Sequence, residues 1–294
     1  MTLSLKNNVR RCRPLLGTFV EISVGHDDPG EAHAAIGAAF AAVERVHRLM
    51  SFHDPESEIS RLNRWAASGE VAVSGETFRV LQCALELHER TRGIFDIAVA
   101  PELMENRTLP RHTFLGGRTD YCGRTADIRF LPGGTVRFSR PLCIDLGGIA
   151  KGFAVDEAVG RLRACGMDSG FVNAGGDMAC FGEPRPVWVR HPRNPGEFLP
   201  LPALENGALA TSANAYLWRE QPCAHIHGQT REPLRRPFSV SVRAGSCLMA
   251  DALTKVVLAL EEESETVLPQ FQATALAVYP DGRVVRYGGD SDEA

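Results

Sequence analysis

Residues 144–156, I-D-L-G-G-I-A-K-G-F-A-V-D, join two kinds of regular structure through a glycine turn. The apolar run 142–146, with one acid inside it, predicts the end of a buried strand. After the glycines, Val155, Val159 and Leu162 recur at helical spacing and predict the buried face of a helix. We therefore expect an α/β fold organised around this stretch.

The glycine turn in this stretch is a candidate anion site. A strand that ends in a glycine turn before a helix directs backbone N–H groups and the positive helix end at an anion. Lys151 adds a point charge suited to phosphate, although a tight turn with a solvated lysine fits the same residues. The letters match neither G-x-x-x-x-G-K-S/T nor G-x-G-x-x-G, which excludes the nucleotide P-loop and the Rossmann fingerprint.

A second glycine turn follows the first. Residues 171–177, F-V-N-A-G-G-D, predict a strand end that runs into a turn with polar residues on both sides. Two such turns favour two walls of one pocket, although each fits a simple loop.

Length, composition and charge limit the class of protein. The 294 residues are 44% hydrophobic and 23% charged, as in globular proteins, and the net charge is −4. This charge argues against broad nucleic-acid binding, which needs a basic surface. Runs of about 18 apolar residues are absent, so we expect no membrane span. The N-terminus lacks an apolar segment after its positive charges, so we expect a cytoplasmic protein.

The cysteines indicate a reducing environment. All eight are scattered without a C-x-x-C pair or a short metal-ligand spacing. We interpret them as reduced residues and expect no zinc site.

The remaining chain predicts alternating helices and strands without repeats or a clear linker. Asp28, Pro29 and Glu31 are typical of a helix start. We expect one compact unit over residues 13–288, with tails at 1–12 and 289–294. Strands are predicted at 19–24, 187–189 and 239–243, helices after Asp28 and Ser74 and over 248–260, hairpins at 127–139 and 273–288, and a polar loop at 105–123.

Two polar groups carry both a functional and a structural interpretation. Residues 50–63 follow a helix and are dense in polar side chains, which is common in functional loops. Ser57 and Asn63 equally fit the caps of a short helix. Asp251 and Lys255 are four residues apart on one predicted helix, where an ordinary surface ion pair is the alternative.

In this order the motifs resemble those of the ApbE family, the FAD:protein FMN transferases. The most specific blocks are residues 145–156 and 172–177, and the resemblance extends from about Arg13 to Tyr287. The supporting blocks are Leu16-Gly17-Thr18, Met50-Ser51 with Ser57, Ser60-Arg61 and Asn63, Phe95-Asp96, Thr211-Ser212, His225-Ile226 and Ala250-Asp251-Ala252-Leu253.

The resemblance implies a fold, a reaction and partners. It implies one mixed α/β (α+β) unit, with mixed sheets flanked by helices and an FAD cleft. Members of the family bind FAD, use magnesium, and transfer FMN to a threonine or serine hydroxyl of a target flavoprotein with release of AMP. A pyrophosphate needs oriented N–H donors and a cation, which the two glycine turns and Lys151 can supply.

The resemblance also implies site residues. His225 and Asp251 would be catalytic, His225 by activating the acceptor hydroxyl or stabilising the transition state. The metal ligands would be Asp251, the Ala150 carbonyl and the nearby Thr254. The flavin would be bound by Leu16, Gly17, His53, Asp96, Asp145, Gly147, Gly148, Ala150, Lys151, Asn173, Gly175, Gly176, Asp177 and Thr211.

Three positions depart from the family pattern, and all fall at the implied site. Lys255 stands where D-A-L-x-T has its metal-binding threonine, and Thr254 is one residue early, about 100° around the helix. His227 stands where an aspartate is expected, in a segment one residue shorter. His53 stands where many members have a tyrosine. A charged lysine cannot bind magnesium, so the metal would be lost or its charge replaced.

These departures leave alternatives to FMN transfer. An ApbE-like protein that binds FAD for storage or delivery is the second hypothesis, favoured by Lys255 and His227. Hydrolysis of FAD to FMN and AMP is the third. A flavin redox enzyme is the fourth, but no nicotinamide fingerprint accompanies the flavin motifs.

Overall fold

The computed structural model describes residues 7–116, 120–194, 196–213 and 222–289. One contiguous core joins two sheets, with Val136 in the smaller and Val240 in the larger. The protein is thus a mixed α/β fold, as predicted. In the described ranges no helix is both long and apolar enough to cross a membrane. The acidic residues 290–294 of the predicted C-terminal tail lie outside these ranges.

Eight strands form the large sheet, in the order β1-β2-β6-β7-β10-β11-β12-β13. Its neighbouring strands pair antiparallel throughout. Short turns join several sequential strands, which needs no crossover helix. The strands are β1 (Asn7–Leu15), β2 (Thr18–His26), β6 (Ser169–Ala174), β7 (Asp177–Phe181), β10 (Ala208–Ala213), β11 (Ser239–Ala244), β12 (Thr274–Val278) and β13 (Val284–Tyr287).

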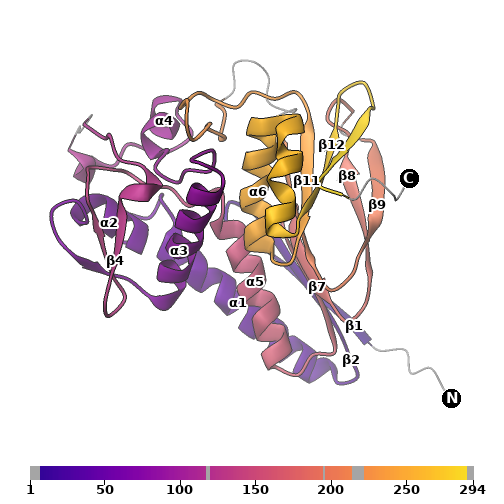
Figure 1. The fold of residues 1–294 in the computed structure, drawn as a ribbon. Coiled ribbons are helices and arrows are strands. Elements are labelled where there is room, and N and C mark those ends of the chain that lie inside the picture. The colour runs from indigo at the N-terminus through magenta and orange to yellow at the C-terminus, as the bar shows by residue number, and fades with distance from the viewer. Residues whose placement is uncertain (1–6, 117–119, 195, 214–221, 290–294) are drawn as a thin grey trace.

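Three helices lie side by side along one face of this sheet (Figure 1). They are α1 (Pro29–Met50), α5 (Ala150–Ala164) and α6 (Cys247–Leu260). The predicted start of α1 is confirmed, since the Asp28 side chain accepts the N–H groups of Gly30 and Glu31. Its residues Ile36, Phe40 and Val43, at helical spacing, are buried.

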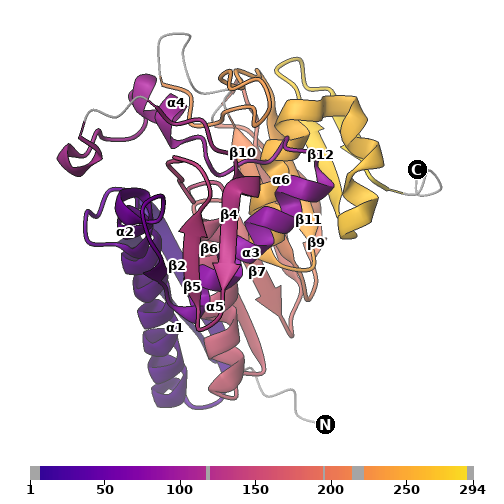
Figure 2. The ribbon, with the colours of Figure 1, turned by 60° about the vertical axis from the view of Figure 1, so that its left-hand side comes forward.

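A smaller part covers the outer side of these helices (Figure 2). Arg79 of α3 pairs with Glu157 of α5 at 3.0 Å and lies over the Phe153 ring, which fixes α3 against α5. This part contains α2 (Glu58–Trp65), α3 (Gly75–Arg90), α4 (Ala100–Glu105), the short helices η1 (Thr113–Leu115) and η2 (Thr125–Asp127), and the sheet β3-β5-β4, with β3 at Val71–Ala72, β4 at Ile128–Leu131 and β5 at Thr135–Phe138.

Two further pieces complete the chain. The ribbon of β8 (Arg185–Arg190) and β9 (Phe198–Leu204) packs on the large sheet through a second cluster that contains Met178, Cys180 and Leu209. This ribbon explains why both faces of β7 are buried. The short helices η3 (Glu261–Thr266) and η4 (Leu268–Phe271) connect α6 to β12.

Residues 142–144 and Leu146 are buried and Asp145 is half-buried, but this segment is not a strand, so the predicted strand end was wrong. The Asn63 side chain, and no neighbouring strand, pairs with the Ile144 backbone: Nδ2 donates to the carbonyl at 2.9 Å and Oδ1 accepts the N–H at 2.8 Å. The Asp145 N–H donates to the Ile97 carbonyl at 2.9 Å. The apolar composition of this segment correctly predicted its burial. Composition does not indicate which groups form hydrogen bonds with the buried backbone N–H and C=O groups.

Strand β1 begins at Asn7 and so includes residues 7–12, which lie before the predicted start of the domain at residue 13. Its backbone pairs with β2 along nine residue pairs. The polar residues of this segment give no strand pattern in the sequence, because an edge strand exposed to water needs no alternation of apolar residues.

Candidate functional site

A cavity of about 710 Å³ lies where the glycine turn meets α1 and α6. Its volume is typical of a small-molecule site, for which about 300–1,000 Å³ is usual. Apolar and polar groups both line it. The lining comes from residues 16–17, 46–53, 94–109, 145–151, 211–213 and 224–226 and from Lys255.

Most of the residues implied by the resemblance are gathered at this cavity. The residues that line it are Leu16, Gly17, His53, Asp96, Asp145, Gly147, Gly148, Ala150, Lys151, Thr211 and His225. The implied residues that do not line it are Asn173, Gly175, Gly176, Asp177, Asp251 and Thr254. Several of the second group contact the first from behind and thereby position it.

The first glycine turn forms one wall of the cavity. The Asp145 carboxylate accepts the Gly147 N–H at 2.9 Å and so closes the turn. Burial raises the pKa of Asp145. Ala150 is the first residue of α5, so Lys151 lies in the first turn of this helix, at its N-terminal end, as predicted. This end of α5 carries a partial positive charge and favours an anion.

The second glycine turn supports this wall from the large sheet. Gly175 and Gly176 have φ values of 65° and 105°, which favour glycine, and Asn173 Oδ1 accepts the Gly176 N–H at 2.9 Å. Asp177 follows this turn and pairs with Lys151. The second turn therefore acts through Lys151.

Lys151 and Lys255 each pair with a buried carboxylate, Asp177 and Asp251 respectively. Burial opposes the charged form of Lys151, but Asp251 and Asp177 outweigh it and raise the Lys151 pKa. Burial also opposes ionisation of Asp251, but Lys151 and Lys255 lower the pKa of this carboxyl. The four side chains thus form two neighbouring ion pairs behind and beside the cavity.

His225 faces this cluster from the loop after β10. Burial lowers the pKa of His225 to about 3, and the positive charges of Lys255 and Lys151 contribute in the same direction. Asp251 opposes this shift without offsetting it. The imidazole is therefore neutral at pH 7.

The β1–β2 turn contributes a backbone with positive φ angles to the cavity lining. Leu16 and Gly17 have positive φ values, 56° and 71°, which suit a two-residue hairpin turn. A non-glycine residue in this conformation costs of order 1 kcal/mol and often marks a ligand site. His53, in the loop after α1, is an exposed side chain at the same cavity.

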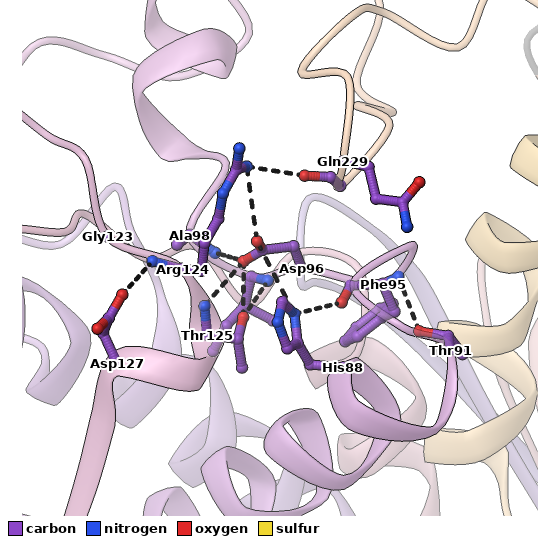
Figure 3. A network of polar contacts seen from close by, with 12 residues as sticks. His88, Thr91, Phe95, Asp96, Ala98, Gly123, Arg124, Thr125, Asp127 and Gln229 are labelled. Atoms are coloured by element: carbon purple, nitrogen blue, oxygen red, sulfur yellow. Dashed lines mark hydrogen bonds and ion pairs between the residues drawn. The ribbon is translucent and has the colours of Figure 1, made fainter.

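Asp96 holds together the segments behind the cavity (Figure 3). Its Oδ1 accepts the Ala98 N–H at 2.8 Å and the Thr125 hydroxyl at 2.7 Å. Its Oδ2 pairs with Arg231 at 3.2 Å and lies 3.8 Å from Arg124. The Asp96 carboxylate is thus occupied by protein donors and positions the wall.

Sequence reasoning missed the apolar part of the lining. This part includes Phe52, Ile94, Ile97, Leu103 and Leu109. Such side chains have the same pattern in a core as in a cavity wall, so the sequence held no signal that distinguishes them.

The side chains at the implied metal position do not fit magnesium. Asp251 is fully buried; Lys255 Nζ holds its Oδ1, and the Gly152 N–H donates to its Oδ2 at 3.1 Å. The Thr254 hydroxyl does not line the cavity: it donates to the Asp251 carbonyl at 2.7 Å and bonds the cavity-lining Ser212 Oγ at 2.8 Å, so both of its partners are protein oxygens. Magnesium prefers free oxygen ligands, and here an ammonium group already holds the carboxylate. Among the described ranges, no three His, Cys, Asp or Glu side chains are grouped to hold a metal ion.

The fold and cavity together define a class of α+β proteins in which a glycine turn at a helix N-terminus adjoins a partly apolar pocket. The sequence matches the ApbE family over residues 16–278. The chain therefore belongs to the ApbE family.

Relatives and solved structures agree with this assignment. The FAD:protein FMN transferase of Treponema pallidum is 26% identical, over 96% of this chain and 87% of that protein. The enzyme of the same name from Rhodobacter capsulatus is 28% identical over 92% of this chain. The match covers 55% of the length of the Rhodobacter capsulatus protein. The flavin transferase ApbE of Vibrio cholerae has a TM-score of 0.81 at 25% identity, covering 97% of this chain and 98% of that one. The ApbE protein of Thermotoga maritima has the same TM-score and identity, covering 96% and 97%.

Proposed function

We propose that the protein is an FAD:protein FMN transferase, which moves FMN from FAD to a serine or threonine hydroxyl of a target flavoprotein. The family match and the names of the relatives support this proposal. The observation that carries it is the combination of an apolar cavity with Lys151, Lys255 and His225 at one end. The flavin ring suits the apolar part, and the diphosphate suits the lysines and the glycine turn.

In the proposed step, the acceptor hydroxyl oxygen bonds to the phosphorus of the FMN half of FAD. The bond from this phosphorus to the oxygen shared with AMP breaks, and AMP leaves with that electron pair. His225 takes the hydroxyl proton as the oxygen–phosphorus bond forms. Lys151 and the N–H groups of the glycine turn stabilise the phosphate charge. No step is assigned to magnesium, because Asp251 is held by Lys255.

The test is incubation of the protein with FAD, in EDTA and in magnesium, followed by chromatography for FMN and AMP. Parallel tubes contain an extract of the source cells, resolved afterwards on a denaturing gel for covalent flavin fluorescence. We expect AMP release to rise together with a fluorescent protein band. Intact FAD in all tubes would contradict transfer.

FAD binding without transfer is the second candidate function. The Lys255–Asp251 pair favours it, because the resemblance implies a metal for transfer and this pair occupies a carboxylate that such a metal would need. Intact FAD that co-purifies with the protein, without AMP release, would identify this function. FMN and AMP without a fluorescent band would instead identify hydrolysis.

The cellular location of the protein was predicted from its cysteines and its N-terminus. All eight cysteines are free of disulfides. A cytoplasmic location stays a prediction, as does the extent of the domain over residues 13–288.

A further inference from the structure

Lys255 lies one helical turn after Asp251 on α6 and lines the cavity. Its ammonium pairs with the Asp251 carboxylate and also donates to the Asp251 carbonyl at 3.0 Å. The Lys255 side chain is 13% exposed and that of Asp251 is 0% exposed. The pair is therefore not an ordinary surface ion pair, which would be solvated on both sides.

The Lys255 side chain reaches the buried carboxylate with its ammonium group and passes the glycine turn with its carbon stem. A Cβ atom added to Gly148 would lie 3.4 Å from Lys255 Cε, so the lysine stem passes directly along the turn. An ammonium group has three protons to donate. Two of them are directed at Asp251, which leaves one for an acceptor in the cavity.

The charges of the cluster explain what this acceptor can be. Lys151 and Lys255 balance Asp177 and Asp251, so the protein side of the cluster is close to neutral. A diphosphate brings two negative charges to a site that contains both ammonium groups and the N-terminal end of α5. A dication would compete with Lys255 for Asp251 and would lie beside a positive charge, which is unfavourable in a buried site.

We propose that the Lys255 ammonium replaces a divalent metal ion in this protein, neutralising Asp251 and donating to the diphosphate of bound FAD, so that FAD binds without magnesium. This inference rests on the proposed function only in taking FAD as the ligand. It specifies how this chain differs from a metal-dependent relative, and the difference is measurable without any turnover.

The first test uses the unmodified protein. FAD binding is measured by titration calorimetry in EDTA and in millimolar Mg²⁺, and Mn²⁺ is titrated with and without FAD while electron paramagnetic resonance reports the free ion. We expect FAD dissociation constants within twofold of each other and no bound Mn²⁺. FAD binding that tightens tenfold or more in Mg²⁺ would overturn the proposal. So would a Mn²⁺ ion that is lost in the Asp251→Asn variant.

The second test uses two substitutions of one residue. Lys255→Thr frees Asp251 and supplies a hydroxyl, so we expect it to bind Mn²⁺ when FAD is present, with FAD affinity at least tenfold higher in metal than in EDTA. Lys255→Met keeps the length of the side chain without its charge, so FAD affinity should fall tenfold or more in both buffers. Wild-type FAD affinity in Lys255→Met would contradict the role of the ammonium.

The outcomes separate this inference from the proposed function. Metal-insensitive FAD binding without AMP release would contradict transfer and support the role of Lys255. Transfer with metal-dependent FAD binding would contradict the role of Lys255 alone. FAD binding in neither buffer would overturn both. Melting temperatures show whether the two variants fold, and the wild-type titrations decide the question if they do not.

Discussion

The Asn63 side chain replaces a neighbouring strand for Ile144: its amide donates to the Ile144 carbonyl at 2.9 Å and accepts the Ile144 N–H at 2.8 Å. Asn63 belongs to α2 and lies far from Ile144 in the sequence, and it is only 7% exposed. This one side chain therefore joins α2 to the segment that enters the glycine turn.

Replacing Asn63 by leucine should destabilise the protein by about 2–4 kcal/mol. The change leaves the Ile144 N–H and carbonyl buried without partners, and each such group costs about 1–3 kcal/mol. The free energy of unfolding in urea measures this loss. Asn8→Leu on the exposed face of β1 is the control and should change stability by less than about 0.5 kcal/mol. Equal losses in the two variants would contradict the role of Asn63.

Replacing Gly152 by alanine should destabilise the crossing of α5 and α6. A Cβ atom at Gly152 would lie 2.2 Å from the Cys247 carbonyl oxygen, so one of the two helices must move. Overpacking of this kind costs about 1–3 kcal/mol. Gly160→Ala, on the same helix with nothing within 4 Å, should stabilise by about 0.5–1 kcal/mol. Thermal unfolding of the two variants should therefore shift in opposite directions.

Replacing Thr125 by valine should loosen the segments around Asp96. The Thr125 hydroxyl donates to Asp96 Oδ1 at 2.7 Å and accepts the Ile97 N–H at 2.9 Å, and Thr125 is fully buried. The isosteric change leaves that N–H without a partner, at a cost of about 1–3 kcal/mol. Hydrogen exchange at Ile97 should accelerate. Unchanged exchange at this amide would show that the hydroxyl does not hold the segment.

Replacing His225 by glutamine should lower the rate of FMN transfer by about 10²–10⁴-fold, the usual contribution of a general base. FAD affinity should stay within about threefold, since the proposed role of His225 is to accept a proton. Single-turnover assays and FAD titration separate the two quantities. His33→Gln, on the exposed side of α1, is the control and should leave both unchanged. Equal losses of rate and affinity would indicate a binding role.

The His225 pKa of about 3 also predicts a pH dependence of stability. The unfolded imidazole gains a proton near pH 6.5, whereas the folded imidazole does so only near pH 3. The contribution of His225 to stability is therefore complete above pH 6.5 and is lost as the pH falls toward 3. Between pH 7.5 and 5, the wild type should lose more unfolding free energy than His225→Gln. A loss of the same size in both would contradict the shift.

Local sequence patterns predicted the elements whose ends are chemically marked. Asp28, Ser57 and Ser74 cap α1, α2 and α3, because a short side-chain oxygen can accept the first helical N–H groups in any context. The glycine turns and the strand alternation of β11 were equally local signals. Contacts between distant residues were not, and the pairing of Asn63 with Ile144 could not be read from either residue alone.

In the candidate site, too, the features with a local sequence signal were predicted and the contacts between distant residues were not. The motif residues predicted from the resemblance include Lys151 and His225, which the fold brings to one cavity. Sequence did not show that the Asp96 carboxylate is satisfied by protein donors, since Thr125 and Arg231 lie in other segments. It identified Lys255 as a departure, but the burial of its pair with Asp251 depends on how α6 packs against the glycine turn.

The order of strands in the large sheet has a consequence for how the chain folds. β2 pairs with β6, Val20 opposite Ala174, so the second strand to be synthesised waits for about half of the chain before its partner exists. Contacts of such long sequence separation slow folding, and the open edge of β2 can pair wrongly in the meantime. Because the β1–β2 turn and the first glycine turn both line the cavity, the ligand site is assembled late, and truncated chains should lack it.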